Sequence, residues 1–257
     1  MLKIDIRRNK ILERLKRDGA VSVTQLASEL GATPVTIRSD LDSLEKDGYL
    51  VRVQGGAVRK PRAVENTTPK GNAAIMSEEK RAIAAEVAKR LQDGNTLFIN
   101  SGTTMEYVAA ALKDRKNLNI VTNALQVALE LGKVSTFRVI LLGGEINAQY
   151  GFTHGNDAQE QLGHYQADWA ILTLDGISAG SGMTTYHAEE SNINRMMIAQ
   201  AKHTLVAADH TKIGRAGFFR FCDAMADMQL VTDSSASPEA INELELCGVD
   251  VTCVGCE

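Results

Sequence analysis

A run of small and hydroxyl-bearing residues, Ser101-Gly102-Thr103-Thr104, follows a predicted strand and begins a predicted helix. Small side chains let backbone N–H groups approach an anion closely, hydroxyl groups add donors, and the helix dipole favours negative charge at this end. The pattern predicts a phosphate-binding turn. It is neither a GxxxxGK loop nor a GxGxxG dinucleotide fingerprint. The alternative that stays open is a turn that serves packing alone, because such turns are common in α/β folds.

Polar residues follow the other predicted strands or lie in the loops beyond them. They supply hydroxyl, amide, carboxylate and ammonium groups, a mixture that suits a polyol phosphate. Lys212 could add a charge for the phosphate, and Asp175 or Asp209 could accept sugar hydroxyls. The alternative is that the Gly and Asp residues form turns and that Lys212 is solvated. The predicted set is Thr122, Asn123, Gly143, Asp175, Gly176, Thr184, Asp209 and Lys212.

Helical and strand-like patterns alternate from Ser77 onward, which predicts a mostly parallel sheet with crossover helices. In such a sheet ligands bind beyond the carboxyl ends of the strands, so these polar residues are expected to meet at one edge. The predicted strands are 96–100, 118–122, 137–142, 169–174, 204–208, 229–232 and 249–254, and the predicted helices lie around 83–91, 105–112, 124–131 and 238–246.

A second set of candidate residues lies near the N-terminus, where Thr33-Pro34 offers a cap and a first helical residue. If Ile37, Leu41 and Leu44 face inward, the opposite side of this helix carries residues that could read the major groove of DNA. Two short strands around Gly55-Gly56 would follow as a wing. The predicted DNA-binding residues are Thr33, Val35, Thr36, Arg38, Ser39, Arg52 and Gln54.

Two shorter helices complete this unit. Ile4, Ile11, Leu12 and Leu15 recur at helical spacing, and a second helix is expected between a cap at Ser22 and an end at Gly31. The order of elements predicts a small winged helix-turn-helix domain. The alternative is a basic helical cap that binds no DNA.

Charge divides the chain in the same way. Residues 1–62 carry 13 Lys and Arg against 8 Asp and Glu, and the remainder carries 15 against 24, which together give the net charge of −4. We expect a DNA-binding domain over 1–59, a linker over 60–76 with two prolines, and an α/β sensor domain over 77–257. With 44% hydrophobic residues, no long apolar run and a start of mixed charge, the chain reads as a cytoplasmic protein without membrane contact.

The N-terminal residues resemble the DNA-binding domain of the DeoR family of bacterial transcriptional repressors. The likeness lies in Val35-Thr36-Ile37-Arg38-Ser39-Asp40-Leu41, in Gly48-Tyr49-Leu50 and in Gly55-Gly56-Ala57. Members usually carry a second arginine where this chain has Ser39, and often a histidine where it has Gln54. Both departures fall on the expected DNA face.

The remaining residues resemble the sensor domain of the same family, which is similar in fold to ribose-5-phosphate isomerases and CoA-transferase-type domains. The resemblance implies an effector phosphate at Ser101, Gly102, Thr103 and Thr104, with the predicted polar set around the sugar. Relatives commonly have lysine at the position of Asn194, so Arg195 is a candidate to replace it.

Two other classes of function have some support in the sequence. Glu189, Glu190, Asp175 and Lys212 could serve a sugar-phosphate isomerase, although the glycine-rich lysine segment of active isomerases is absent. Cys253 and Cys256 have half the spacing of a zinc or redox site, and we expect incidental thiols, no metal and no cofactor. The resulting prediction is a homo-oligomeric repressor that binds operator DNA and responds to a phosphorylated sugar, with no catalytic residue.

Overall fold

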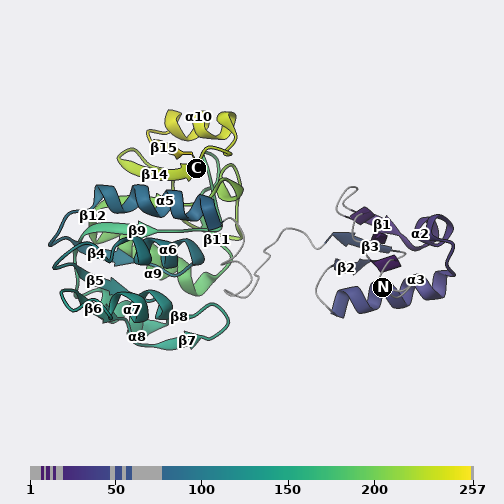
Figure 1. Cartoon of the computed structure of the whole chain (residues 1–257), viewed down its shortest axis with the longest axis horizontal. Helices are drawn as coiled ribbons and strands as arrows, with labels where there is room; N and C mark the ends of the chain where they lie inside the picture. Colours follow the sequence, from purple (N-terminus) through teal and green to yellow (C-terminus); the bar gives the residue numbers. More distant parts are fainter. Residues whose placement is uncertain are drawn as a thin grey trace. The chain divides into compact units, whose positions relative to one another are not determined.

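The computed structural model describes residues 7–8, 10–11, 14–15, 20–46, 50–53, 56–59 and 77–255. The chain forms two compact units, Met1–Glu65 and Asn66–Glu257 (Figure 1). The predicted linker over 60–76 lies outside the described residues, so its two boundaries stay a prediction.

The first unit contains two well-bounded helices, α2 (Val23–Leu30) and α3 (Pro34–Lys46), and a small antiparallel sheet. The sheet has the order β1-β3-β2, from β1 (Ala20–Ser22), β2 (Leu50–Val53) and β3 (Gly56–Arg59). Strand β1 was not predicted. Of the predicted first helix, the described residues Arg7, Arg8, Lys10, Ile11, Arg14 and Leu15 are helical, and the rest lie outside the described part.

The core of the first unit joins all of these elements. Ile11 and Leu15 pack with Leu26, Ile37 and Leu41, and the core also takes in Val21, Val23, Leu44, Leu50 and Ala57. The stripe predicted to face inward on α3 is therefore buried. Ser22 stands at the predicted N-cap position of α2, with extended backbone, but its side chain makes no capping hydrogen bond.

The second unit is built on a seven-stranded parallel sheet in the order β15-β14-β12-β9-β4-β5-β6. This confirms the predicted fold class, and each strand lies near its expected place. The strands are β4 (Thr96–Ile99), β5 (Asn119–Thr122), β6 (Arg138–Leu141), β9 (Ala167–Leu172), β12 (Ala201–Ala207), β14 (Met228–Asp233) and β15 (Asp250–Val254).

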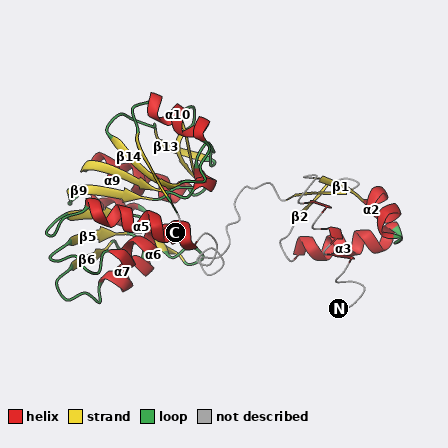
Figure 2. Cartoon of the chain, turned by 45° about the horizontal axis from the view of Figure 1, so that its top comes forward, coloured by secondary structure: helices red, strands yellow, loops and turns green. Residues whose placement is uncertain are grey.

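Helices cover both faces of this sheet. On one face α5 (Ser77–Arg90), α6 (Thr103–Ala111) and α7 (Leu125–Leu131) bury Leu97 and Ile99 of β4, and these helices lie on the same side in Figures 1 and 2. On the other face α8 (Asn156–Leu162) and α9 (Ala188–Ala199) pack on Phe98. Successive side chains of β4 thus point to opposite faces of the sheet and pack into two separate cores. Helix α10 (Pro238–Leu246) joins a third cluster around Ile177, Met183 and Leu230.

Several short elements complete the carboxyl edge of the sheet. An antiparallel sheet is formed by β10 (Gly176–Ser178), β11 (Gly182–Thr185) and β13 (Phe219–Cys222), and a hairpin by β7 (Glu145–Asn147) and β8 (Phe152–His154). None of these strands was predicted. The 3-10 turn η1 (His210–Lys212) follows β12.

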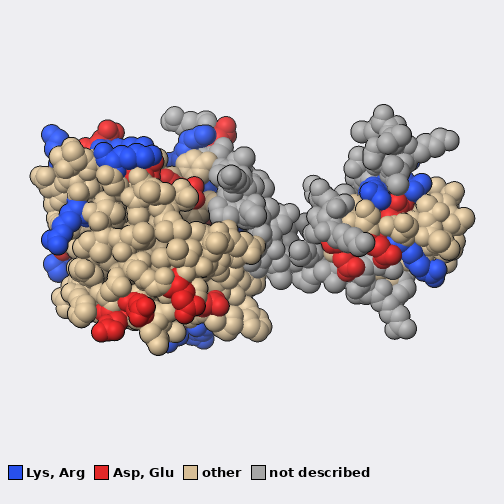
Figure 3. Space-filling view, turned by 90° about the horizontal axis from the view of Figure 1, so that it is seen from below, with Lys and Arg blue, Asp and Glu red and all other residues tan. Residues whose placement is uncertain are grey.

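Charged side chains are unevenly spread over the second unit. On the face seen in Figure 3, Lys, Arg, Asp and Glu gather along the rims and leave a broad centre without them. Among the described helices, none combines the length and apolarity that a membrane span requires.

Candidate functional site: an exposed helix face and a polar sheet edge

The turn before α3 is fixed by two local devices. Gly31 ends α2 in the left-handed conformation, with φ 59° and ψ 35°, and its N–H donates to the Ala27 carbonyl. Thr33 then caps α3, because its Oγ1 accepts a hydrogen bond of 3.2 Å from the Thr36 N–H. The predicted end of α2 and the predicted start of α3 are both confirmed. Together they set the direction in which α3 leaves α2.

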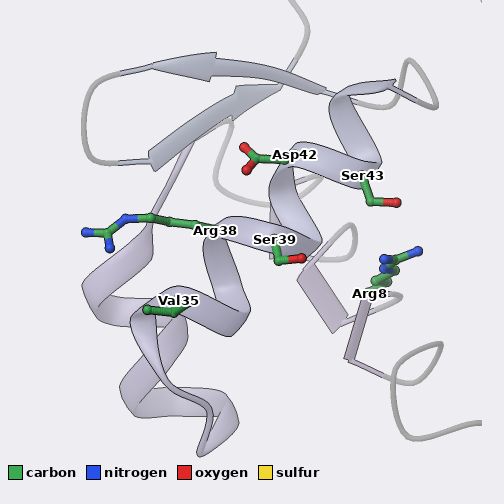
Figure 4. Close-up of a pocket in the computed structure, with 6 residues that line it drawn as sticks. All are labelled: Arg8, Val35, Arg38, Ser39, Asp42 and Ser43. Carbon is green, nitrogen blue, oxygen red and sulfur yellow. The ribbon is translucent and has the colours of Figure 1, made fainter.

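One exposed stripe of α3 lines a hollow of about 540 Å³ (Figure 4). The hollow is bordered by Val35, Arg38, Ser39, Asp42 and Ser43 of α3 and by Arg8. Val35 keeps 71% of its surface exposed, so this side of α3 contributes nothing to the core of the unit. This is the stripe predicted to face DNA. Thr33 is exposed and Thr36 half-buried, whereas the Arg52 side chain and Gln54 lie outside the described residues.

The turn after β4 depends on a glycine. Gly102 has φ 140°, and a Cβ at this position would lie 2.3 Å from Cγ2 of Thr173. The neighbouring Asn100 ties the ends of β4 and β9 together, because its Nδ2 donates to the Thr173 carbonyl and its Oδ1 accepts from the Thr173 N–H, both at 2.9 Å. The first N–H groups of α6, at Thr103 and Thr104, follow directly and have no partner within the helix.

Beside this turn lies a buried carboxylic acid, Glu190 of α9. Its Oε1 forms a short hydrogen bond with the Ser101 hydroxyl, and its Oε2 accepts from Thr185 Oγ1 at 3.2 Å. Burial raises the pKa of Glu190 to about 7. The hydrogen bonds with Ser101 and Thr185 lower this pKa, and the negative charge of Asp175 raises it further. A large share of Glu190 is therefore protonated near neutral pH, at the edge where a phosphate is expected.

The predicted residues Asp175, Gly176 and Thr184 hold the small sheet together. Asp175 Oδ2 accepts from the Tyr186 N–H at 2.9 Å and also lies 3.2 Å from Thr185 Oγ1, whose single proton serves either Asp175 or Glu190 at one time. The Thr184 hydroxyl donates to the Gly176 carbonyl and accepts from the Gly217 N–H. The hydroxyl of Thr184 is thus already engaged on both sides, and only Asp175 retains an oxygen for which the described residues record no hydrogen bond.

The residues after β5 and β6 are also partly engaged. Thr122 Oγ1 accepts from the Ala124 N–H at 3.0 Å, and the Gly143 N–H donates to Gln161 Oε1 at 2.9 Å. Asn123 donates its amide to the Thr153 carbonyl at 3.1 Å, and its buried Oδ1 has no partner among the described residues. An unpaired buried carbonyl lowers the stability of the folded state, so the Oδ1 of Asn123 is available to accept a hydrogen bond from a ligand.

Two cations lie at the same edge around Asp209. Asp209 is buried after β12 and its Oδ1 accepts from the Thr211 N–H at 3.0 Å, which fixes the turn that carries Lys212. Lys80, in the first turn of α5, is buried, and this burial lowers its pKa while Asp209 raises it and Lys212 lowers it. Sequence reasoning missed Lys80, because nothing in the helical pattern around it marks its electrostatic interaction with Asp209 and Lys212, which lie far away in the sequence.

Arg195 is not brought to this edge by any recorded contact. Its Nε donates to the Phe221 carbonyl of β13 at 3.3 Å. The neighbouring Asn194 is buried and accepts from Asn100 Nδ2 at 3.1 Å. Asn194 thus holds the inner position on α9, and the effector role of Arg195 stays a prediction.

The thiols and acidic residues give no metal centre within the described ranges. No group of three or more His, Cys, Asp or Glu there is placed to hold an ion. Cys253 is an exposed free thiol, and Cys256 lies outside the described residues.

Comparison with known proteins matches both units to one family. Residues 7–62 match the model described as a DeoR-like helix-turn-helix domain, and residues 75–234 match the DeoR C terminal sensor domain. The glycerol-3-phosphate regulon repressor of Escherichia coli (strain K12) is 35% identical over 94% of this chain and 98% of its own length. The lactose phosphotransferase system repressor of Lactococcus lactis subsp. lactis is 32% identical over 92% and 94%.

Solved structures resemble part of the chain at much lower identity. Ribose 5-phosphate isomerase A of Methanocaldococcus jannaschii is 13% identical and covers 53% of this chain and 54% of its own, with a TM-score of 0.40. A likeness at this level carries no activity to the present chain. These two repressors span more than nine tenths of the chain, which sets the isomerase alternative aside. The chain belongs to the DeoR family and is a DNA-binding transcriptional regulator rather than an enzyme.

Proposed function

We propose that this protein represses genes of carbohydrate metabolism and releases its operator when a phosphorylated sugar binds the sensor unit. The observation that carries the proposal is the turn at Gly102, which has no room for a Cβ and begins α6 beside a buried polar cluster. The printed names of the relatives, which refer to a glycerol-3-phosphate regulon and a lactose phosphotransferase system, support a sugar-derived effector.

The phosphate is assigned to the start of α6. The N–H groups of Thr103 and Thr104 would donate to its oxygens, and Lys212 and Lys80 would supply positive charge from η1 and α5. A carboxylate beside a phosphate would oppose binding, and the raised pKa of Glu190 removes much of this repulsion near neutral pH. The helix N-terminus and the two cations favour an anion, and partial protonation of Glu190 weakens the opposing charge.

The sugar is assigned to the neighbouring strand ends. Asp175 has acceptor capacity for hydroxyl groups, and the orphaned Oδ1 of Asn123 would gain the donor that it lacks. The two residues follow β9 and β5, which lie on either side of β4 in the sheet. A ligand with its phosphate at the Gly102 turn would therefore have polar groups on both sides of its carbon chain.

Operator binding is assigned to a homo-oligomer. One recognition helix contacts few base pairs, so two copies at a fixed spacing are needed for a specific site. Effector binding would favour an arrangement in which the copies no longer match the half-sites. A change from mostly bound to mostly free requires a preference of about 5.5 kcal/mol for the released arrangement.

A gel-shift titration tests the proposal. Purified protein is titrated on DNA from immediately upstream of its own gene, near physiological salt and with excess competitor DNA, because nonspecific phosphate contacts would otherwise imitate binding. A panel of phosphorylated sugars and their free forms is then added. We expect a specific shift that one phosphorylated sugar abolishes and its free form does not. A specific shift that no member of the panel alters would contradict the effector assignment.

A further inference from the structure

Two arginines of the N-terminal helical segment share a single carboxylate of the recognition helix. Arg7 Nε lies 2.5 Å from Oδ2 of Asp40, and Arg8 Nε lies 3.3 Å from Oδ1 of the same residue. Asp40 is only 2% exposed, whereas the Arg8 side chain keeps 28% of its surface exposed. The buried carboxylate of Asp40 thus holds both arginine side chains from the interior of the unit. The cluster of Arg7, Arg8 and Asp40 retains one positive charge in excess.

Arg8 also borders the hollow along the exposed stripe of α3. Among the described residues that line this hollow, Arg8 alone comes from outside α3. Figure 4 places Arg8 beside Ser39 and Ser43, while Arg38 extends on the other side of the stripe. A cation at the border of a helix that enters the major groove is suited to the sugar-phosphate strand that flanks the groove, because half or more of protein–DNA hydrogen bonds go to the backbone and arginine is a common donor.

From this geometry we infer that Arg8 binds a DNA backbone phosphate and that Asp40 is the positioning residue that aims it. A phosphate contact carries no base information, but it fixes the register in which the Val35, Arg38 and Ser39 face meets the base edges. The inference takes DNA binding by this unit as given. It adds one contact from outside α3 and a reason for burying an acidic residue beneath a DNA-binding face.

The test is the salt dependence of binding, measured by fluorescence anisotropy on the full chain. Two labelled duplexes are used, one cut from the DNA immediately upstream of the gene and one with the same bases shuffled. Potassium chloride is varied between about 50 and 200 mM, because each lost phosphate contact lowers the slope of log K against log salt by about 0.9. The variants are Arg8→Gln, Arg8→Lys and Asp40→Asn.

Arg14→Gln is the matched control. Arg14 belongs to the same helical segment and pairs with Glu29 at 3.1 Å, but it does not line the hollow. We expect Arg8→Gln to lower the slope by about 0.9 per bound protomer on both duplexes, and Arg14→Gln and Arg8→Lys to retain it. An unchanged slope in Arg8→Gln, or an equal drop in Arg14→Gln, would overturn the inference.

Asp40→Asn separates positioning from simple support of the fold. It leaves the charge of Arg8 in place, so the slope should be at least that of the wild type, while the preference for the upstream duplex over the shuffled one falls about tenfold or more. Equal losses of affinity on both duplexes would mean that Asp40 only stabilises the unit, and would overturn its positioning role. Failure of the DNA-binding assignment is distinguishable, because the wild type itself would then show no preference for the upstream duplex.

Discussion

Replacing Glu190 by glutamine should remove a pH-dependent part of the stability of the sensor unit. The pKa of Glu190 is raised from 4.5 to about 7, chiefly by burial. Between these two pH values the folded chain holds a proton that the unfolded chain has released. Stability is therefore lost as the pH rises from about 4.5 to about 7, and the loss is complete above that range. The difference between the two pKa values corresponds to about 3 kcal/mol.

The assay is urea unfolding of the full chain at a series of pH values. The single tryptophan, Trp169, lies in β9 and reports the sensor unit through its fluorescence. We expect the free energy of unfolding of the wild type to fall by about 3 kcal/mol relative to Glu190→Gln between about pH 4.5 and 7.5. Taking the difference cancels the groups that both proteins share.

Glu189→Gln is the control for this experiment, since Glu189 is the exposed neighbour on the same helix. Its difference from the wild type should stay constant within about 0.5 kcal/mol, as for an ordinary surface substitution. A constant difference for Glu190→Gln as well would refute the reasoning, because Glu190 would then titrate like an exposed residue.

Three further predictions concern the two units separately. Arg38→Ala should lower the preference for the upstream duplex over a shuffled one by about tenfold or more, since a base contact carries about 1–3 kcal/mol. Binding of the effector, measured by calorimetry, should stay unchanged. Loss of both DNA preference and effector binding would mean that the units are misassigned. Gly102→Ala should reduce the effector response at least about tenfold in an operator-release titration, because its Cβ would lie 2.3 Å from Thr173 Cγ2. An unaltered response would show that this turn plays no part in effector binding. Thr33→Ala should destabilise the first unit by about 1 kcal/mol in thermal unfolding followed by circular dichroism, whereas Thr33→Ser should retain the cap; equal stability of the two would argue against it.

Local signals were sufficient to predict which face of α3 is exposed. Thr33 and Pro34 mark the start of α3 within four residues of sequence, and the spacing of Ile37, Leu41 and Leu44 defines which side of that helix is buried. The parallel sheet was predictable for a similar reason, since its strands are short apolar runs between helical patterns. In both cases the information is contained within one element.

The sensor edge was only partly predictable, because its key contacts join distant segments. Ser101 and Glu190 are 89 residues apart, and no periodicity connects them. The strands β10, β11 and β13 have only three or four residues each, too few to show a clear period of two, and none of them was predicted. Thr184 is among the predicted effector-binding residues, and its hydroxyl is engaged within the small sheet.

We propose that a phosphate at the Gly102 turn controls operator binding, and one titration tests this control directly. Release of the upstream duplex is followed by anisotropy as one sugar is added in phosphorylated and in free form, to the wild type and to Gly102→Asp. We expect release of the wild type by the phosphorylated form alone, and no release of Gly102→Asp, because its Cβ would lie 2.3 Å from Thr173 Cγ2 and its negative charge would repel the phosphate. Equal release by the free sugar, or by the phosphorylated sugar from both proteins, would contradict the account.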